Sequence, residues 1–294
     1  MRQDLAGANR KENMKVIFRA DDVGYTYTHN LGTFKAVDEG VVTSLDVMLD
    51  CPGLEDACEK IKERPWLSLG WHTHFWGRPA LDPSEVPSMV DENGRFKWRK
   101  DKEAAKTVVY EEALKECRAQ IERFAKLTGR VPDTCGGQSD TPLGKAILEV
   151  CDEYHIAYNF MQGSGWGGKP LPCKEKYLDK NIYEWTARGM GFTKTLNVVD
   201  FPDYHPADAI MAMPIEENRI WMRSQHPGFL DDYVLAESSC TIPRVRDVEA
   251  LCDPRVVQWI KDNRIELINF RDALYGSNEY QQHLKSIGSD LCVL

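Results

Sequence analysis

Short apolar segments alternate with longer amphipathic segments along about 260 residues of this chain. The segments expected to be strands are rich in β-branched and aromatic residues; they cover 15–20, 41–49, 67–75, 156–160, 195–200, 219–226 and 265–270. The segments expected to be helices cover 30–39, 54–63, 101–127, 142–153 and 247–262. Such alternation favours a parallel sheet covered by helices. With seven or eight units and no break between them, we expect an α/β fold, a single irregular β/α (TIM-like) barrel of about seven strands.

The chain is expected to form one folded domain behind a short extension. Residues 1–13 are polar and lack the apolar core of a signal peptide, so a disordered N-terminal extension is expected there. The barrel domain is expected to span 14–294. Gly40 stands where helix 30–39 would end in a left-handed conformation. The segment 77–100 is long for a loop in a compact domain, which is typical of a functional loop.

The charge and the cysteines argue against several classes of protein. The formal net charge is −9, whereas nucleic-acid binding depends on Lys and Arg side chains that neutralise phosphates. The same charge argues against an anionic membrane surface. The nine cysteines are odd in number and include no C-x-x-C pair, so neither a disulfide framework nor a zinc ribbon is expected. They are typical of reduced thiols in a cytoplasmic protein.

Polar residues follow three of the expected strands, at the end of the barrel where active sites lie. Asp21 and Asp22 end the first strand in RADDVG. Adjacent acids often cap the next helix, but two carboxylates can also divide their work, one as a metal ligand and one as a base. His226 follows a late strand in SQHPGF, where a turn residue is the simpler interpretation.

The stretch LSLGWHTHF carries two of the seven histidines. Because side chains alternate along a strand, His72 and His74 are expected on one face behind Ser68 and Gly70. Histidines at an exposed strand end are the alternative. The small residues before them favour an open polar cavity, and imidazole is a common ligand of divalent metals.

Taken together, these motifs resemble the YdjC-like (ChbG-type) carbohydrate deacetylase family. The resemblance covers Met14 to about Ala273. It rests on RADDVG with the Asn of the next helix, on LGWHTHFWGRP, on VDENGRF, and on HPGFLDDY followed by RVRDVEALCDP. It implies an irregular β/α barrel, a divalent metal such as Mg or Zn, and hydrolysis of the N-acetyl group of an amino sugar or oligosaccharide.

The resemblance also implies roles for individual residues. Asp21 would be the general base that acts on metal-activated water, Asp22 and His72 would be metal ligands, and His226 would be the acid that assists the leaving amine. Trp76 would stack on a sugar ring, or else would anchor its loop. A small carbohydrate is the implied partner, and barrels of this size often form homodimers.

One segment departs from the family pattern. The family carries a histidine-rich third motif, whereas PDTCGGQSDTP (132–142) contains no histidine. Depending on the alignment, Cys135 or Gln138 falls where the third ligand is expected, and Asp140 is a further candidate for an oxygen ligand. His74 is an additional histidine, and we expect it to compensate as a ligand or as a substrate contact.

This departure leaves two alternatives to a deacetylase. One is a catalytically altered or inactive family member that binds a saccharide without deacetylating it. The other is a barrel hydrolase that uses Cys135 as its nucleophile.

Overall fold

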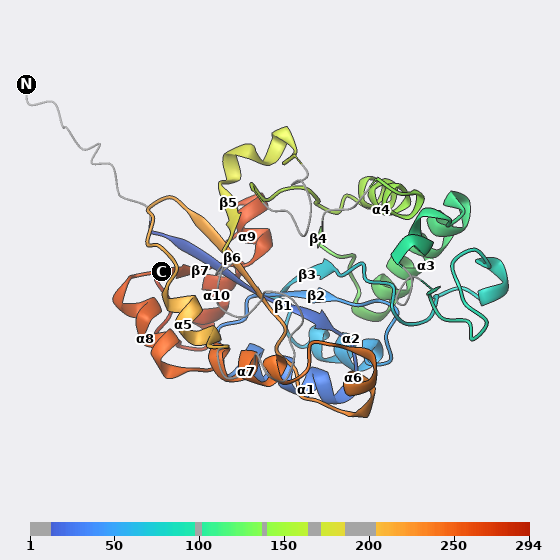
Figure 1. Cartoon of the computed structure of the whole chain (residues 1–294). Coiled ribbons are helices and arrows are strands. Elements are labelled where there is room, and N and C mark those ends of the chain that lie inside the picture. The colour runs from blue at the N-terminus through green and yellow to red at the C-terminus, as the bar shows by residue number, and fades with distance from the viewer. Residues whose placement is uncertain (1–12, 98–101, 137–139, 164–171, 186–203) are drawn as a thin grey trace, which may run out of the picture.

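The computed structural model describes residues 13–97, 102–136, 140–163, 172–185 and 204–294. In this part of the chain, a parallel sheet has the order β4-β3-β2-β1-β6-β5, and β7 pairs with the start of β1 (Figure 1). The strands are β1 (Lys15–Val23), β2 (Ser44–Val47), β3 (Ser68–Trp71), β4 (Thr134–Cys135), β5 (Ile182–Glu184), β6 (Ile220–Gln225) and β7 (Glu266–Leu267). Two isolated parallel bridges, Thr134 to Ala157 and Gln162 to Tyr183, connect β4 to β5 through segment 157–162. The sheet thereby curls into the irregular barrel that the sequence predicts.

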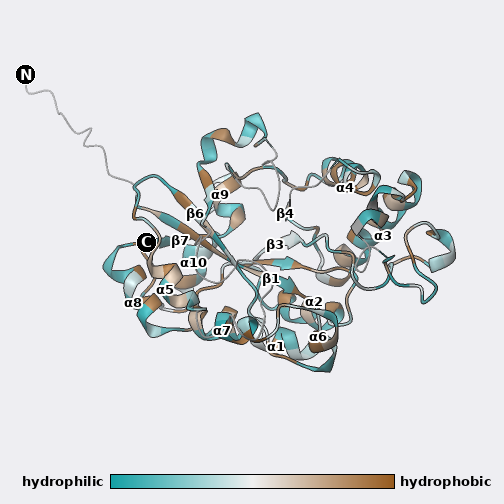
Figure 2. Cartoon of the chain, in the orientation of Figure 1, coloured by the Kyte–Doolittle hydropathy of each residue, from teal (hydrophilic) through white to brown (hydrophobic). Residues whose placement is uncertain are grey.

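Helices surround the sheet in the same order as the strands. They are α1 (Tyr27–Asp38), α2 (Leu54–Lys62), α3 (Tyr110–Thr128), α4 (Pro142–Glu153), α5 (Pro206–Met211), α6 (Asp232–Glu237), α7 (Ile242–Leu251), α8 (Pro254–Asp262), α9 (Phe270–Tyr275) and α10 (Glu279–Ser286), with 3-10 turns η1 (Pro83–Glu85), η3 (Lys102–Lys106) and η4 (Glu175–Lys180). Contacts run from α4 through α3, α2, α1 and α7 to α5 and α8. Hydrophobic and hydrophilic residues both occur around α3 and α4 (Figure 2), as expected of helices with one buried face.

The central strand β1 shows why polar chemistry gathers at one end of the barrel. Phe18 and Ala20 belong to the apolar core under the helices, whereas Ile17 points to a second apolar cluster inside the barrel. Arg19 and Asp21 continue the inner face of the strand, because side chains alternate. The interior is therefore apolar where β1 begins and polar where it ends.

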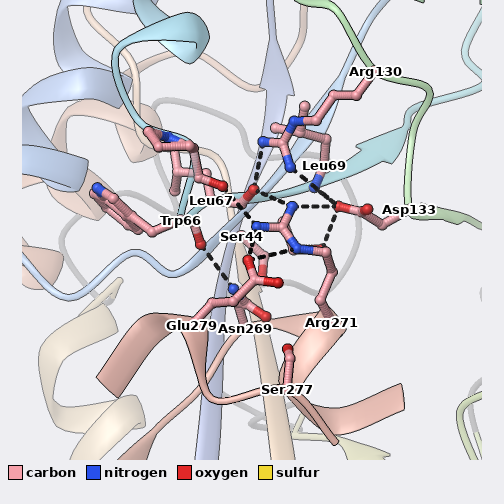
Figure 3. Close-up of polar contacts among 12 residues, drawn as sticks. Ser44, Trp66, Leu67, Leu69, Arg130, Asp133, Asn269, Arg271, Ser277 and Glu279 are labelled. Atoms are coloured by element: carbon pink, nitrogen blue, oxygen red, sulfur yellow. Dashed lines mark hydrogen bonds and ion pairs between the residues drawn. The ribbon is translucent and has the colours of Figure 1, made fainter. Parts of the chain in front are cut away.

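A separate polar network closes the end of the barrel where the strands begin (Figure 3). Asp133 precedes β4, and its Oδ2 accepts hydrogen bonds from the Leu69 amide at 2.8 Å and the Ser68 hydroxyl at 3.1 Å. Arg271 of α9 donates to the same oxygen at 3.2 Å and to the Leu67 carbonyl at 2.9 Å. This network joins β3, β4 and α9, and it has a structural role away from the ends of β1 and β3.

Several expected elements differ in their bounds. Segment 247–262 forms two helices, α7 and α8, because Pro254 starts a new helix. The expected strand 156–160 is reduced to the bridge at Ala157. The expected strand 195–200 and most of the N-terminal extension, 1–12, lie outside the described residues.

The expected left-handed cap at Gly40 is wrong. Gly40 has no left-handed φ, whereas Gly129 after α3 does, at 81°. A Cβ atom at Gly40 would lie 2.5 Å from the carbonyl oxygens of both Ala36 and Leu251. Close packing of α1 against the end of α7, and not backbone conformation, therefore requires a glycine at this position.

All nine cysteines lie in the described residues, and all are free thiols. None of the helices in the described part of the chain combines the length and the apolarity that a membrane crossing needs.

Candidate metal centre

Asp22 lies at the end of β1 in an uncommon backbone conformation. Its φ is +60°, in the left-handed region that non-glycine residues seldom adopt. The side chain is almost fully buried, at 2% exposure. Left-handed conformations of this kind cluster at functional sites, where the surrounding structure holds them in place.

His72 and His74 reach the site by a tight turn after β3. The strand ends at Trp71, one residue before His72, so the expectation that both histidines lie on one strand face is wrong in its geometry. The His74 amide donates to the His72 carbonyl at 3.0 Å, and Phe75 has a φ of +54°. This turn brings the two imidazole rings to 4.1 Å between centroids, closer than the two rises of about 3.3 Å that an extended strand imposes.

Asp22, His72 and His74 form a group that could hold a metal ion. Their ligand atoms all lie within 4.8 Å of one another, and among the described residues no other such group of His, Cys, Asp and Glu occurs. His72 Nε2 lies 2.9 Å and His74 Nε2 lies 3.4 Å from Asp22 Oδ1. The His74 side chain is 34% exposed, so one side of the group is open to solvent.

Asp46 of β2 orients the His72 ring. Its Oδ2 lies 3.5 Å from His72 Nδ1, on the side of the ring away from Asp22. A carboxylate facing the second nitrogen of a ligating histidine fixes the tautomer and makes the first nitrogen a better ligand. Asp46 also pairs with Arg19 at 3.4 Å.

His74 is held by its stacking on Trp76. The two rings are 4.2 Å apart and inclined by 25°. The turn that carries Trp76 is fixed by the buried Asp50, whose Oδ2 accepts the Gly77 amide at 2.6 Å. A Cβ atom at Gly77 would lie 1.8 Å from the Asp50 carbonyl oxygen, so only glycine fits there. The additional histidine therefore has a rigid support.

The charges in the group are strongly coupled. Burial would raise the pKa of Asp22, but Arg244, His72 and His74 outweigh burial and hold it well below its usual range. Burial would lower the pKa of His72, but hydrogen bonds to Asp22 and Asp46 raise it to about 10. In the metal-free protein at neutral pH, an imidazolium at His72 therefore bridges two carboxylates.

The donor set fits a divalent transition metal. One carboxylate oxygen and two imidazole nitrogens are typical ligands of zinc, and catalytic zinc sites keep three protein ligands and one open position. Ligand atoms about 2.1 Å from a tetrahedral ion lie about 3.4 Å apart, close to the separation of His74 Nε2 from Asp22 Oδ1.

Asp21 and His226 lie beside this group. Asp21 is 2% exposed, and Arg19 binds both of its carboxylate oxygens, at 2.6 and 2.9 Å. His226 follows β6, and its amide donates to Asp247 of α7 at 2.8 Å. Burial lowers the pKa of His226, while the charges of Asp22 and Asp21 oppose this effect. His226 is thus within electrostatic reach of both acids.

Comparison with known proteins shows the family to which this chain belongs. A family model described as YdjC-like protein matches residues 15–262. This chain belongs to the YdjC-like family. It is 30% identical to a carbohydrate deacetylase of Clostridium beijerinckii over 269 residues, 88% of this chain and 100% of that protein. It is 29% identical to a carbohydrate deacetylase of Brevibacillus brevis over 265 residues, 88% of this chain and 99% of that protein.

The YdjC-like fold is also shared with a solved structure. A crystal structure of an Enterococcus faecalis V583 protein assigned to cellobiose-phosphate cleavage is 27% identical and has a TM-score of 0.66. The match covers 89% of this chain and 99% of that chain. The likeness therefore extends over nearly the whole barrel.

The structure does not bring Cys135 or Asp140 of this YdjC-like chain to the metal group. Cys135 pairs in register with Trp71, so both side chains face the helices, and Cys135 lies in the main apolar core. A hydrogen bond with Cys151 and burial raise the pKa of the Cys135 thiol. Asp140 is exposed and pairs with Lys145 at 3.0 Å. Gln138 lies outside the described residues.

Cys135→Ala is expected to leave metal content and activity unchanged. The variant removes a buried sulfur, which should lower the free energy of unfolding by about 1 kcal/mol. Metal analysis of the purified variant checks this expectation, and Cys151→Ala is the matched control from the same thiol pair. A loss of bound metal in Cys135→Ala but not in Cys151→Ala would show that the thiol is a ligand.

Sequence reasoning about this YdjC-like protein missed three supporting residues. Asp46 lies on an expected strand, and its alternation with Ser44 could have placed it on the inner face. Arg19 shares the inner face of β1 with Asp21, which the same period-two pattern indicates. Arg244 has no such signal, because an arginine in an amphipathic helix is usually on the surface.

Proposed function

We propose that this chain is a metal-dependent carbohydrate deacetylase that hydrolyses the N-acetyl group of an amino sugar or oligosaccharide. The observation that carries the proposal is the convergence of Asp22, His72 and His74 next to Asp21 and His226 at one end of the barrel. The relatives named carbohydrate deacetylases support the reaction class.

In this proposal Asp22, His72 and His74 hold the metal. A divalent ion at such a site lowers the pKa of a water molecule and polarises the carbonyl of the substrate. His74 takes the place of the histidine that segment 132–142 lacks. Its partial exposure leaves the substrate side of the site accessible.

Asp21 is the proposed general base. A carboxylate has about four lone-pair positions, and the bidentate contact with Arg19 occupies two of them. The remaining positions can accept the proton of the attacking water. Arg19 also keeps the carboxylate in one orientation, and correct orientation is a large part of the efficiency of a base.

His226 is the proposed acid for the leaving amine. Burial and the nearby Arg244 lower its pKa, and Asp22 and Asp21 counteract them. The lowered pKa favours the neutral imidazole, so in this proposal the proton that Asp21 removes from the attacking water passes to His226 and from there to the amine nitrogen. Trp76 is the proposed sugar contact, because its ring stacks on His74 beside the open side of the group.

Acetate release from N-acetylated glucosamine oligosaccharides tests the proposal. We expect turnover that a chelator abolishes and added Zn²⁺ restores. Asp21→Asn should keep the metal and lose about 10²–10⁴-fold in kcat, the usual contribution of a general base. Acetate release that is insensitive to both the chelator and the Asp21→Asn change would contradict the proposal.

Because segment 132–142 contains no histidine, the alternative function is that of a YdjC-like protein that binds a saccharide without deacetylating it. The same assay separates the two functions. Binding of the oligosaccharide without acetate release, under zinc saturation, would favour the alternative.

A further inference from the structure

Arg244 is the most deeply buried cation next to the metal group. It is 1% exposed, and its guanidinium contacts several different partners. Nη2 donates to Asp22 Oδ2 at 2.7 Å, and Nη1 lies 3.0 Å from His29 Nε2. Nε donates to the Cys240 carbonyl at 2.7 Å, and Nη2 also reaches the Ser238 hydroxyl at 3.1 Å. The planar fork of arginine suits several fixed partners at once.

The two carboxylate oxygens of Asp22 have different partners. Oδ2 is bound by the guanidinium, whereas Oδ1 faces His72 and His74. An ion held by the two imidazoles would therefore meet Oδ1, while the charge-assisted hydrogen bond from Arg244 competes for Oδ2 and holds it on the other side.

His29 continues the chain of contacts away from the metal group. The ring is fully buried in α1. Because arginine has only donors, His29 Nε2 must be the acceptor, which places the ring proton on Nδ1. Nδ1 lies 3.4 Å from the Thr33 hydroxyl, and that hydroxyl donates to the Pro227 carbonyl at 2.6 Å. Burial and Arg244 lower the pKa of His29, in agreement with a neutral ring.

The turn that follows His226 lies directly on the His29 ring. A Cβ atom at Gly228 would lie 2.1 Å from His29 Cδ2, and one at Gly32 would lie 2.5 Å from the Phe229 amide nitrogen. Glycines at both positions therefore let the backbone of the turn pack directly on α1 and on the His29 ring. Any shift of the ring would displace the turn that carries His226.

From these contacts we infer that Arg244 and His29 are positioning residues, which restrict Asp22 to one ligating oxygen and connect it through Thr33 to the turn that carries His226. The inference rests on the proposed function and deepens it. Ligand and acid are then fixed relative to each other by a single buried chain of hydrogen bonds.

Substitutions of Arg244 test the first half of the inference with Co²⁺ as the probe. In Arg244→Met the second oxygen of Asp22 is released, so the coordination number should rise and the visible absorption of bound Co²⁺ should weaken. We expect kcat to fall about 100-fold, as small misplacements of reacting groups do, with KM within about threefold. Arg244→Lys keeps the positive charge, so its melting temperature should return to the wild-type value. Its Co²⁺ spectrum should not, because an ammonium lacks the planar set of donors of a guanidinium.

A purely structural role predicts a different result. If Arg244→Lys restores the spectrum together with the melting temperature, or if Arg244→Met leaves the Co²⁺ spectrum unchanged, the restriction of Asp22 by Arg244 is wrong.

Thr33→Val tests the connection to His226. The variant removes only the hydroxyl between His29 and Pro227, so the Co²⁺ spectrum should stay unchanged while kcat falls about tenfold and KM does not change. Thr43→Val is the matched control, because Thr43 is equally buried and its hydroxyl donates to the Phe18 carbonyl. Equal kcat values for the two variants would overturn this half of the inference.

The wild-type protein separates this inference from the proposed function. Co²⁺ binding without acetate release would contradict only the proposed function, and the spectra of the Arg244 variants would still decide the inference. A wild-type protein that binds no Co²⁺ would overturn both.

Discussion

His74→Ala is expected to lower the affinity for a divalent metal more than about 100-fold. Loss of the hydrogen-bond partner of a ligating histidine already lowers metal affinity about 10–100-fold, and this variant removes a ligand itself. His74 Nε2 lies 3.4 Å from Asp22 Oδ1, and no described residue of segment 132–142 reaches the group. Zinc titration against a competing chelator measures the change.

The control for this experiment is a histidine outside the site. His205 is exposed before α5, so His205→Ala should bind zinc as the wild type does. An affinity of His74→Ala within about threefold of the wild type would mean that His74 does not compensate for the missing histidine. The third ligand would then have to be sought elsewhere.

Metal affinity is expected to rise steeply with pH above neutrality. The pKa of His72 is about 10 in the metal-free protein, so the ring carries a proton that an ion must displace from Nε2. Below that pKa each bound ion releases one proton, and the apparent affinity should rise about tenfold per pH unit. Between pH 6.5 and 8.5 the expected gain is therefore about 100-fold, after correction for protonation of the competing chelator.

An ordinary histidine would behave differently. With a pKa near 6.5, its affinity for the ion would change little above pH 7. Asp22 adds no proton over this range, because its pKa lies well below its usual value. Asp46→Asn removes one of the two carboxylates that raise the pKa of His72, so this pKa should fall. The metal affinity of the variant should therefore stop rising at a lower pH than that of the wild type. A constant wild-type affinity from pH 7.5 to 8.5 would contradict the raised pKa.

Much of the fold and part of the site can be predicted from local patterns. The alternation of strands and helices predicts the barrel, because each pattern reflects burial on one face of its own element. The positions of Asp21, Asp22 and His226 follow from the rule that polar residues after parallel strands meet at one end. The pattern of the strand that precedes each residue is therefore enough to predict it as a site residue.

The rest of the site depends on contacts that no local pattern contains. His74 reaches Asp22 because β3 ends early and Phe75 adopts a left-handed φ. Arg244 contacts Asp22 across 222 positions in the sequence. Cys135 is a ligand candidate in the alignment, but β4 is only two residues long, and its register with Trp71 decides which way the thiol faces.

A crystal structure of the zinc-loaded protein, with anomalous data at the zinc edge, tests the central claim most directly. We expect one ion bound by Asp22 Oδ1 and by the imidazole nitrogens of His72 and His74, with Arg244 still on Oδ2. An ion held by residues of segment 132–142 with His74 turned away, or no ion at saturating zinc, would contradict the account.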